Sequence, residues 1–180
     1  MQIETITTLR LLLRKITPEV MTYVHTTYAQ NDLMTFLGAT TIEALEKEQI
    51  RFAEGLSTYN RKFEYFQLLQ NGSDKVVGWC GFHTWYIDHD RAEIGYGLFD
   101  EGLKRKGQMT EAMQAILKHG FDLMNLHRVE AFVGKENAAS IRLLDNFGFS
   151  KEGIFREHYQ VDEKNEDSLG YSLLKDEWRK

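Results

Sequence analysis

The chain has little cysteine, little proline and no long apolar run. Its one cysteine, Cys80, excludes a disulfide framework and a cysteine-rich zinc site, and such sparse use is typical of a reducing cytoplasm. The longest aliphatic runs, such as Leu11–Leu13, fall far short of the roughly 20 apolar residues that a membrane-spanning helix needs. No basic stretch followed by an apolar one opens the sequence, so we expect no signal peptide and a cytoplasmic protein.

Positive charge is in the minority. The chain carries 22 Lys and Arg against 27 Asp and Glu, which gives a formal net charge of -5 and a pI near 5.7. Nucleic-acid binding usually needs a basic face, so this balance argues against it and favours a cationic partner. The six histidines form no closely spaced ligand set, so the sequence predicts no metal site.

What remains is the composition of an ordinary globular protein. Apolar residues make up 42% of the chain and charged residues 27%, and eleven Phe, eight Tyr and three Trp supply bulk for a core. A length of 180 residues fits one domain, and no repeat, low-complexity tract or linker divides the chain. We therefore expect a single domain over residues 1–180.

The residue pattern predicts a mixed α/β sheet in the order β-α-α-β-β-β-α-β-α-β-β. Thr17-Pro18-Glu19 is typical of a helix start, and Asn71-Gly72 is a strong hairpin signal between two strands. The predicted strands cover residues 9–16, 63–69, 75–85, 91–99, 127–133 and two segments within 155–174. The predicted helices begin at residue 18 and cover about 41–56, 109–124 and 137–146.

The most informative segment is a charged turn between a strand and a helix. Lys104, Arg105 and Lys106 precede Gly107, and a helix begins directly after them. The first N–H groups of a helix are unpaired and carry the positive end of its dipole, and a glycine lets a phosphate approach the backbone closely. A solvated basic turn is the alternative. The turn has neither the NTPase phosphate-loop pattern nor the Rossmann glycine pattern.

Several segments together resemble one enzyme family. Ala92-Glu93-Ile94-Gly95-Tyr96, followed by residues 106–112, resembles the acetyl-CoA-binding core of the GNAT N-acetyltransferase superfamily. Residues 8–14, 126–130, 137–144, 147–149 and 171–178 are similar to its ribosomal-protein N-terminal acetyltransferase (RimJ/RimL-type) branch. The resemblance covers nearly the whole chain. It implies an α+β fold with a twisted, mostly antiparallel sheet of about seven strands, about four flanking helices and a splayed parallel strand pair.

The resemblance also implies acetyl-CoA as co-substrate, bound in the cleft between the two splayed strands, with no metal. Lys104 stands where the family usually has Gln or Arg, and Met109 stands where it has Gly or Ala. Asn137 would contact the cofactor near its thiol end, although a plain helix cap is the alternative role. The cofactor-binding residues implied are Leu98, Phe99, Lys104, Arg105, Lys106, Gly107, Gln108, Met109, Thr110 and Asn137.

The implied reaction is attack of a neutral amine on a thioester, so the amine must first lose a proton. At pH 7 this costs roughly 1.4 kcal/mol for an α-amine and roughly 4.6 kcal/mol for a lysine amine. We expect Glu93 to act as the base, because alternation places it on one strand face with Gly95 and Gly97, which leave room. The alternative is a surface carboxylate, or one paired with Arg91 or His89.

The leaving thiolate needs a hydrogen-bond donor. Many family members use a Tyr seven residues after the helix-start Asn, but this chain has Leu144 there. The RimJ/RimL-type branch often has a Ser three residues after the Asn, which matches Ser140, and we expect Ser140 to hydrogen-bond the sulfur and to relay a proton to it from water. A serine that only satisfies the first turn of the helix is the alternative.

The sequence therefore predicts an acetyl-CoA-dependent N-acetyltransferase acting through a ternary complex. The preferred acceptor is the N-terminal α-amine of a protein such as a ribosomal protein. A small amine, such as a polyamine, amino acid or antibiotic, is the alternative acceptor, and a non-catalytic CoA-binding regulator is a third reading. We expect no nucleic-acid or membrane partner, and the residues leave a monomer and a homodimer equally open.

Overall fold

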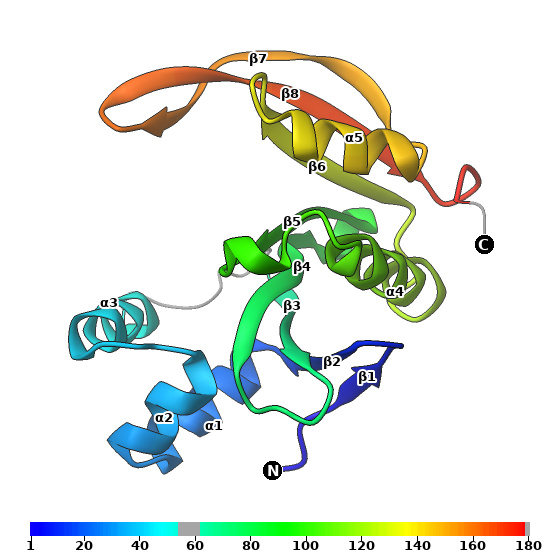
Figure 1. Cartoon of the computed structure of the whole chain (residues 1–180). Helices are drawn as coiled ribbons and strands as arrows, with labels where there is room; N and C mark the ends of the chain where they lie inside the picture. Colours follow the sequence, from blue (N-terminus) through cyan, green and yellow to red (C-terminus); the bar gives the residue numbers. More distant parts are fainter. Residues whose placement is uncertain (54–61, 179–180) are drawn as a thin grey trace.

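The computed structural model describes residues 1–53 and 62–178. They form one eight-stranded sheet with the strand order β1-β2-β3-β4-β5-β6-β8-β7, in which only β5 and β6 are parallel (Figure 1). The strands are β1 (Thr5–Thr7), β2 (Leu11–Ile16), β3 (Lys62–Gln70), β4 (Val76–Tyr86), β5 (Arg91–Leu98), β6 (Arg128–Gly134), β7 (Ser150–Val161) and β8 (Lys164–Leu174). The helices are α1 (Pro18–Thr27), α2 (Gln30–Leu37), α3 (Ile42–Ala53), α4 (Gln108–Asp122) and α5 (Ala138–Asn146), with short 3₁₀ turns at Ile87–His89 and Glu101–Leu103.

The α+β class, the mostly antiparallel sheet and the parallel pair are confirmed. Two elements were not expected from the sequence: the three-residue strand β1 and the helix α2. The predicted helix over residues 41–56 is α3 as far as Ala53, and residue 56 lies outside the described residues. The predicted hairpin is formed by β3 and β4, whose connection includes Gly72 in the left-handed region at φ 79°.

Side-chain caps explain where two of the helices begin. Thr17 is extended, its hydroxyl accepts the Val20 N–H at 3.3 Å, and Pro18 occupies the first helical position of α1. Asn137 caps α5 in the same way, because its Oδ1 accepts the Ser140 N–H at 3.1 Å. These caps set where the chain turns from a strand into a helix.

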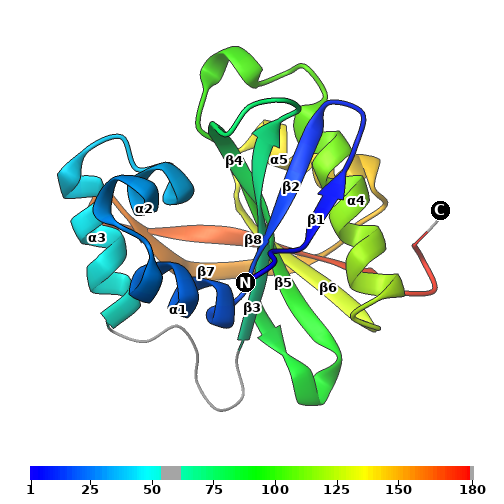
Figure 2. The ribbon, with the colours of Figure 1, turned by 90° about the horizontal axis from the view of Figure 1, so that it is seen from below.

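The helices lie on opposite faces of the sheet (Figure 2). Helices α1 to α3 pack on the face that carries Phe63 and Tyr65 and form a separate buried cluster. Helices α4 and α5 pack on the other face, where Phe66 and Phe82 are buried with Met113 in the larger cluster. Burial of these side chains provides most of the driving force for folding.

The two parallel strands separate soon after they meet. β5 pairs with β6 only from Arg91 to Glu93, opposite Arg128 to Glu130. Beyond this point β5 stays on β4 and β6 stays on β8. The structure thus has the splayed pair that the family resemblance implied, and the ends of β5 and β6 flank a gap in the ladder.

Candidate functional site

The charged turn has a backbone shaped for an anion. Gly107 lies in the left-handed region at φ 77°, directly before α4, and no side chain caps the helix. Lys104, Arg105 and Lys106 are exposed. Glycine adopts this conformation without the strain that a Cβ brings, and it leaves the first N–H groups of the helix accessible. The turn can therefore offer backbone donors and positive charge to one phosphate group.

A cation that the sequence did not single out holds this turn in place. The Arg10 guanidinium, next to β2, donates to the Lys106 carbonyl at 2.6 Å and to Glu111 at 2.7 Å. The Glu111 carboxylate also accepts the Thr8 hydroxyl at 2.6 Å, and these partners lower the pKa of Glu111, against the opposing effect of burial. One Arg10 nitrogen would lie 3.4 Å from a Cβ at Gly107. Arg10 thus fixes the turn against the N-terminal strands.

The end of β5 offers backbone groups to the gap beside β6. The Phe99 N–H already donates to the Val77 carbonyl at 2.9 Å, so it is committed to β4. Backbone groups alternate in direction along an antiparallel ladder, so those of Leu98 point toward the β6 side. Of the two residues expected here, Leu98 can supply backbone partners, while Phe99 presents an exposed ring.

The first turn of α5 faces the same gap. Asn137 serves as the helix cap, which is the structural role the sequence left open, and its Oδ1 is used for that bond. Ser140 lies close to Tyr96 of β5, whose buried hydroxyl has no hydrogen-bond partner of good geometry. Burial raises the pKa of Tyr96 to about 12, and Ser140 opposes that change more weakly. Among the described residues, the Tyr96 hydroxyl is therefore a buried group without a hydrogen-bond partner.

Glu93 lies on the opposite face, where the parallel pairing ends. Its side chain is 16% exposed, and its Oε1 lies 3.3 Å from Nε2 of His83 and 3.4 Å from the hydroxyl of Tyr159. Among the described residues, Glu93 forms no ion pair or hydrogen bond with Arg91 or His89, the alternative partners considered from the sequence, and Arg91 pairs with Glu130. Both contacts converge on one carboxylate oxygen, which leaves the other for a ligand or a water molecule.

A β-bulge places the imidazole beside Glu93. Phe82 pairs with Ile94 and Thr84 pairs with Glu93, so His83 is an extra residue in β4. Bulges of this kind redirect a side chain. A Cβ at Gly95 would lie 2.6 Å from His83 and 2.6 Å from Trp79. The room expected at Gly95 is therefore filled by these two rings.

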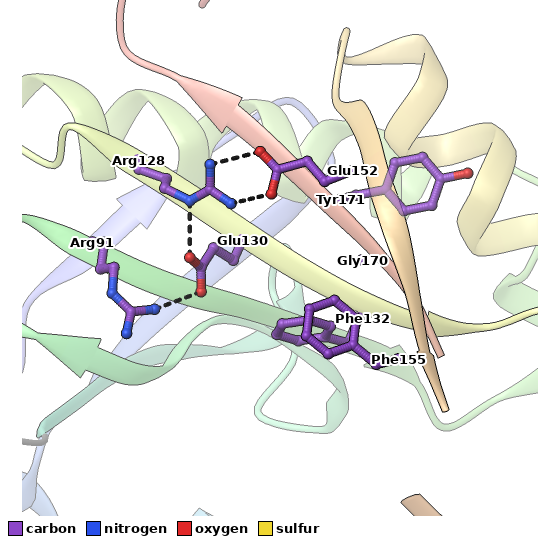
Figure 3. Close-up of a pocket in the computed structure, with 8 residues that line it drawn as sticks. All are labelled: Arg91, Arg128, Glu130, Phe132, Glu152, Phe155, Gly170 and Tyr171. Carbon is purple, nitrogen blue, oxygen red and sulfur yellow. Dashed lines mark hydrogen bonds and ion pairs between the residues drawn. The ribbon is translucent and has the colours of Figure 1, made fainter. Parts of the chain in front are cut away.

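A pocket of about 210 Å³ lies on the same face, one strand further along the sheet (Figure 3). Its charged groups form a chain: Arg91 binds Glu130 at 2.7 Å, and Arg128 binds Glu130 at 2.8 Å. Arg128 also binds both oxygens of Glu152, at 2.8 and 2.5 Å. Glu130 lies directly opposite Glu93 in the β5–β6 pairing, so the pocket lies next to Glu93. The remaining wall consists of Phe132, Phe155, Gly170 and Tyr171.

The described residues contain no group of three or more His, Cys, Asp or Glu side chains that could hold a metal. Cys80 is fully buried, and burial raises the pKa of its thiol. In the same parts of the chain, no helix is both long and apolar enough to span a membrane.

The structure divides the residues expected from the sequence into two groups. Leu98 lies at the end of β5, the phosphate turn directly precedes α4, and Asn137 and Ser140 lie at the start of α5. Glu93 lies at the last β5–β6 pair, on the strand face opposite to that of Leu98. Sequence reasoning missed Arg10, His83 and Tyr159. An antiparallel register and a bulge bring the last two to Glu93, and neither can be read from the local sequence.

Comparisons with known proteins identify the family of the chain. A model of the acetyltransferase (GNAT) domain matches residues 10–150. The uncharacterized N-acetyltransferase p20 of Bacillus licheniformis is 33% identical over 177 residues, covering 97% of this chain and 98% of that protein. The crystal structure of an acetyltransferase (GNAT family) from Bacillus anthracis matches with a TM-score of 0.66 at 28% identity, covering 96% of this chain and 99% of that one.

Two more distant relatives from Escherichia coli have named acceptors. The [ribosomal protein uS5]-alanine N-acetyltransferase is 26% identical over 63% of this chain and 59% of its own length. The spermidine N(1)-acetyltransferase is 26% identical over 50% of this chain and 48% of its own. The family model spans most of the chain, as does the match to p20. This chain therefore belongs to the GNAT acetyltransferase family, whose members transfer an acetyl group to an amine.

Proposed function

We propose that the protein transfers the acetyl group of acetyl-CoA to the N-terminal α-amine of a protein, such as a ribosomal protein. The observation that carries the proposal is the position of Glu93, which lies at the last pair of the parallel strands with one oxygen held by His83 and Tyr159. A carboxylate at that point is next to the gap in which the thioester would lie.

The residues around the gap fit acetyl-CoA. The left-handed Gly107 and the uncapped start of α4 would take the pyrophosphate, with Lys104 to Lys106 supplying charge. The Gln108 side chain is buried at this helix start, and its Oε1 has no hydrogen-bond partner there, which a ligand donor could satisfy. The Leu98 backbone would pair with the pantetheine arm, and Met109, Thr110 and the Asn137 amide would contact the bound coenzyme. The bound thioester supplies the acetyl group.

The chain's own residues prepare the amine and the leaving group. Glu93, acting directly or through a water molecule, removes the proton that blocks attack. The C–N bond then forms while the C–S bond breaks, the electron pair of the C–S bond moves to sulfur, and the acylated nitrogen gives its remaining extra proton to water. Ser140 donates a hydrogen bond to the sulfur as its charge develops. A ternary complex suffices, and no covalent enzyme intermediate is required.

The charges near Glu93 favour an α-amine over a polyamine. A polyamine carries several ammonium groups and needs several unpaired carboxylates. In the adjoining pocket Glu130 and Glu152 are both bound by arginine, so they are neutralised. Glu93 is left to receive one ammonium group, and an α-amine is the easiest to deprotonate. The uS5-alanine relative acts on an acceptor of this kind, as its name states.

A thiol-release assay over an acceptor panel tests the proposal. We expect CoA release with peptides that have a free N-terminus, none with the same peptides blocked by formylation, and little with spermidine or free amino acids. Faster release with spermidine than with every peptide would favour the small-amine alternative. Tight acetyl-CoA binding without release for any acceptor would identify a CoA-binding regulator instead.

A further inference from the structure

Two walls of different chemistry line the pocket next to Glu93 (Figure 3). The charged wall consists of two arginines and two glutamates that are all held in ion pairs: Arg91, Arg128, Glu130 and Glu152. The apolar wall is formed by the rings of Phe132 and Phe155, whose centroids lie 4.9 Å apart at an interplanar angle of 84°. The charges of the first wall balance, so the pocket presents apolar surface without a net charge.

A glycine lets the Phe155 ring lie close to the sheet. Gly170 of β8 lies opposite Phe132 of β6. A Cβ at Gly170 would lie 2.5 Å from Cε2 of Phe155 and 3.5 Å from Cε1 of Phe132. Phe155 is nonetheless 44% exposed. A ring that is packed on one side and open on the other can bury the apolar surface of a ligand.

Aromatic contacts connect this apolar wall with Glu93. The ring of Phe155 lies 5.2 Å from that of His158, which lies 4.4 Å from the ring of Tyr159. The Tyr159 hydroxyl lies 3.4 Å from Oε1 of Glu93. Glu93 is also paired with Glu130 across β5 and β6, and neighbouring strands lie about 4.8 Å apart. A group bound at Glu93 is therefore about one strand spacing from the pocket.

Aromatic rings cover the other side of Glu93, toward β4. His83 contacts Glu93 there, and the rings of His83 and Trp79 both lie over Gly95. Trp79 packs edge-on against Tyr65, with 5.9 Å between the ring centroids. Of the two sides of Glu93 along the sheet, the β6 side is the one on which the pocket lies.

We propose that this pocket binds the side chain of the first residue of the acceptor peptide, and that it selects an uncharged apolar side chain such as that of leucine, methionine or phenylalanine. This inference rests on the proposed function. The first side chain is attached to the carbon that carries the reacting nitrogen, so it reaches one strand spacing from Glu93. The pocket volume of about 210 Å³ is below the ~300–1,000 Å³ of ordinary small-molecule sites and suits a single side chain.

The ion pairs disfavour a charged first residue. An acidic or basic side chain would meet a wall whose ions already neutralise one another, so its own charge would lose water without gaining a counter-ion. Contact of an apolar side chain with Phe132 and Phe155 is favourable instead. Full burial of a leucine or phenylalanine side chain corresponds to a gain in affinity of roughly 10- to 100-fold.

The first test measures binding and does not depend on turnover. Peptide amides that differ only in their first residue are titrated by calorimetry into the protein saturated with coenzyme A. We expect the leucine-first peptide to bind about 10- to 100-fold more tightly than the glycine-first peptide, and the aspartate-first and lysine-first peptides to bind no more tightly than glycine. Undetectable binding of the leucine-first peptide, equal affinities for leucine and glycine, or tighter binding of a charged first residue would overturn the inference.

The second test removes part of the apolar wall. We expect Phe155→Ala to reduce the preference for leucine over glycine roughly tenfold, because the contact area of the ring is lost, with unchanged affinity for acetyl-CoA. Ile154→Ala is the matched control, because Ile154 is the preceding residue of β7, is 61% exposed and lies on the opposite strand face. It should keep the full preference. Equal effects of Phe155→Ala on both peptides, or the same loss of preference in Ile154→Ala, would overturn the inference.

The third test separates this inference from the proposed function. Thiol release is measured with the peptides and with the amides of the single amino acids leucine and glycine. The ratio of leucine to glycine reports the pocket, and the ratio of peptide to amino-acid amide reports the class of acceptor. A leucine preference with faster release from the single amides would support the pocket and reject a protein acceptor. Release from peptides without a leucine preference would reject the pocket and keep the proposed function.

Discussion

At the scale of single residues, Glu93 is the group whose loss has the clearest kinetic signature. We expect Glu93→Gln to lower kcat at pH 7 by about 10²-fold, within the range for a general base. The loss should be smaller at pH 9, where an α-amine with a pKa of about 8 is already neutral. The pH–rate profile measures this, and Glu43→Gln on the exposed side of α3 is the control. Equal losses at both pH values would remove Glu93 as the base.

A second residue-scale prediction concerns a buried carboxylate away from the reaction. Glu64 of β3 is ion-paired with His119 of α4 and lies 3.3 Å from the Lys15 amine. Burial raises the pKa of Glu64, but these partners together outweigh it and leave the pKa below its ordinary value. Because the folded pKa is depressed, this carboxylate stabilises the fold at neutral pH, and the contribution fades as pH falls below the ordinary carboxyl range of about 4.

We therefore expect Glu64→Gln to lower the free energy of unfolding by about 2 to 3 kcal/mol at pH 7, since it leaves buried partners uncompensated. The difference from the wild type should shrink between about pH 5 and pH 3. Urea unfolding across this range measures it. Glu48→Gln, in the exposed pair with Arg51, should change stability by less than about 1 kcal/mol. A difference for Glu64→Gln that stays constant with pH would contradict this account of the ion pair.

At the scale of elements, the turn before α4 is the place where we propose that the coenzyme's pyrophosphate binds. Gly107→Glu would put a side chain on a left-handed residue and an anion where the pyrophosphate is proposed to bind. We expect calorimetry to detect no acetyl-CoA binding, with a stability loss of about 1 to 2 kcal/mol from the backbone conformation.

Gly72→Glu is the matched control for this variant. Gly72 has φ 79°, almost the same as Gly107, and a Cβ there would meet nothing within 4 Å. Gly72→Glu should lower the free energy of unfolding by a similar amount through backbone strain, but it should bind acetyl-CoA normally. If both variants bind acetyl-CoA equally well, the pyrophosphate does not bind at the α4 turn.

Sequence patterns predicted most of the elements but only part of the site. Long strands and α4 have strong periodicity, and the Thr17 and Asn137 caps mark their helices clearly. Strand β1 is too short to show a pattern, and α2 follows Ala29 without a side-chain cap. The phosphate turn is continuous in sequence and therefore visible, whereas the contacts of Glu93 depend on how distant strands align.

At the scale of the whole molecule, three residue pairs join the two halves of the sheet. In the described parts of the chain, strands β1 to β5 and strands β6 to β8 are connected in the ladder only through the β5–β6 pairs at residues 91–93 and 128–130. A coenzyme bound across both strands would add contacts between the halves. At 100 times its dissociation constant, coenzyme A should stabilise the fold by about 2.7 kcal/mol.

For a chain of this size, that energy corresponds to a rise in Tm of roughly 5 to 10 °C. Scanning calorimetry measures it, and Gly107→Glu at the same coenzyme concentration should show no rise. An unchanged Tm in the wild type at saturating coenzyme would argue against binding across the two halves.

The extra residue in β4 has a structural consequence. Deleting His83 would let Phe82 and Thr84 follow one another in regular pairing with β5. The strand would become more uniform, and Glu93 would be left without the imidazole beside it. The irregularity of β4 and the His83 partner of Glu93 therefore come from the same inserted residue.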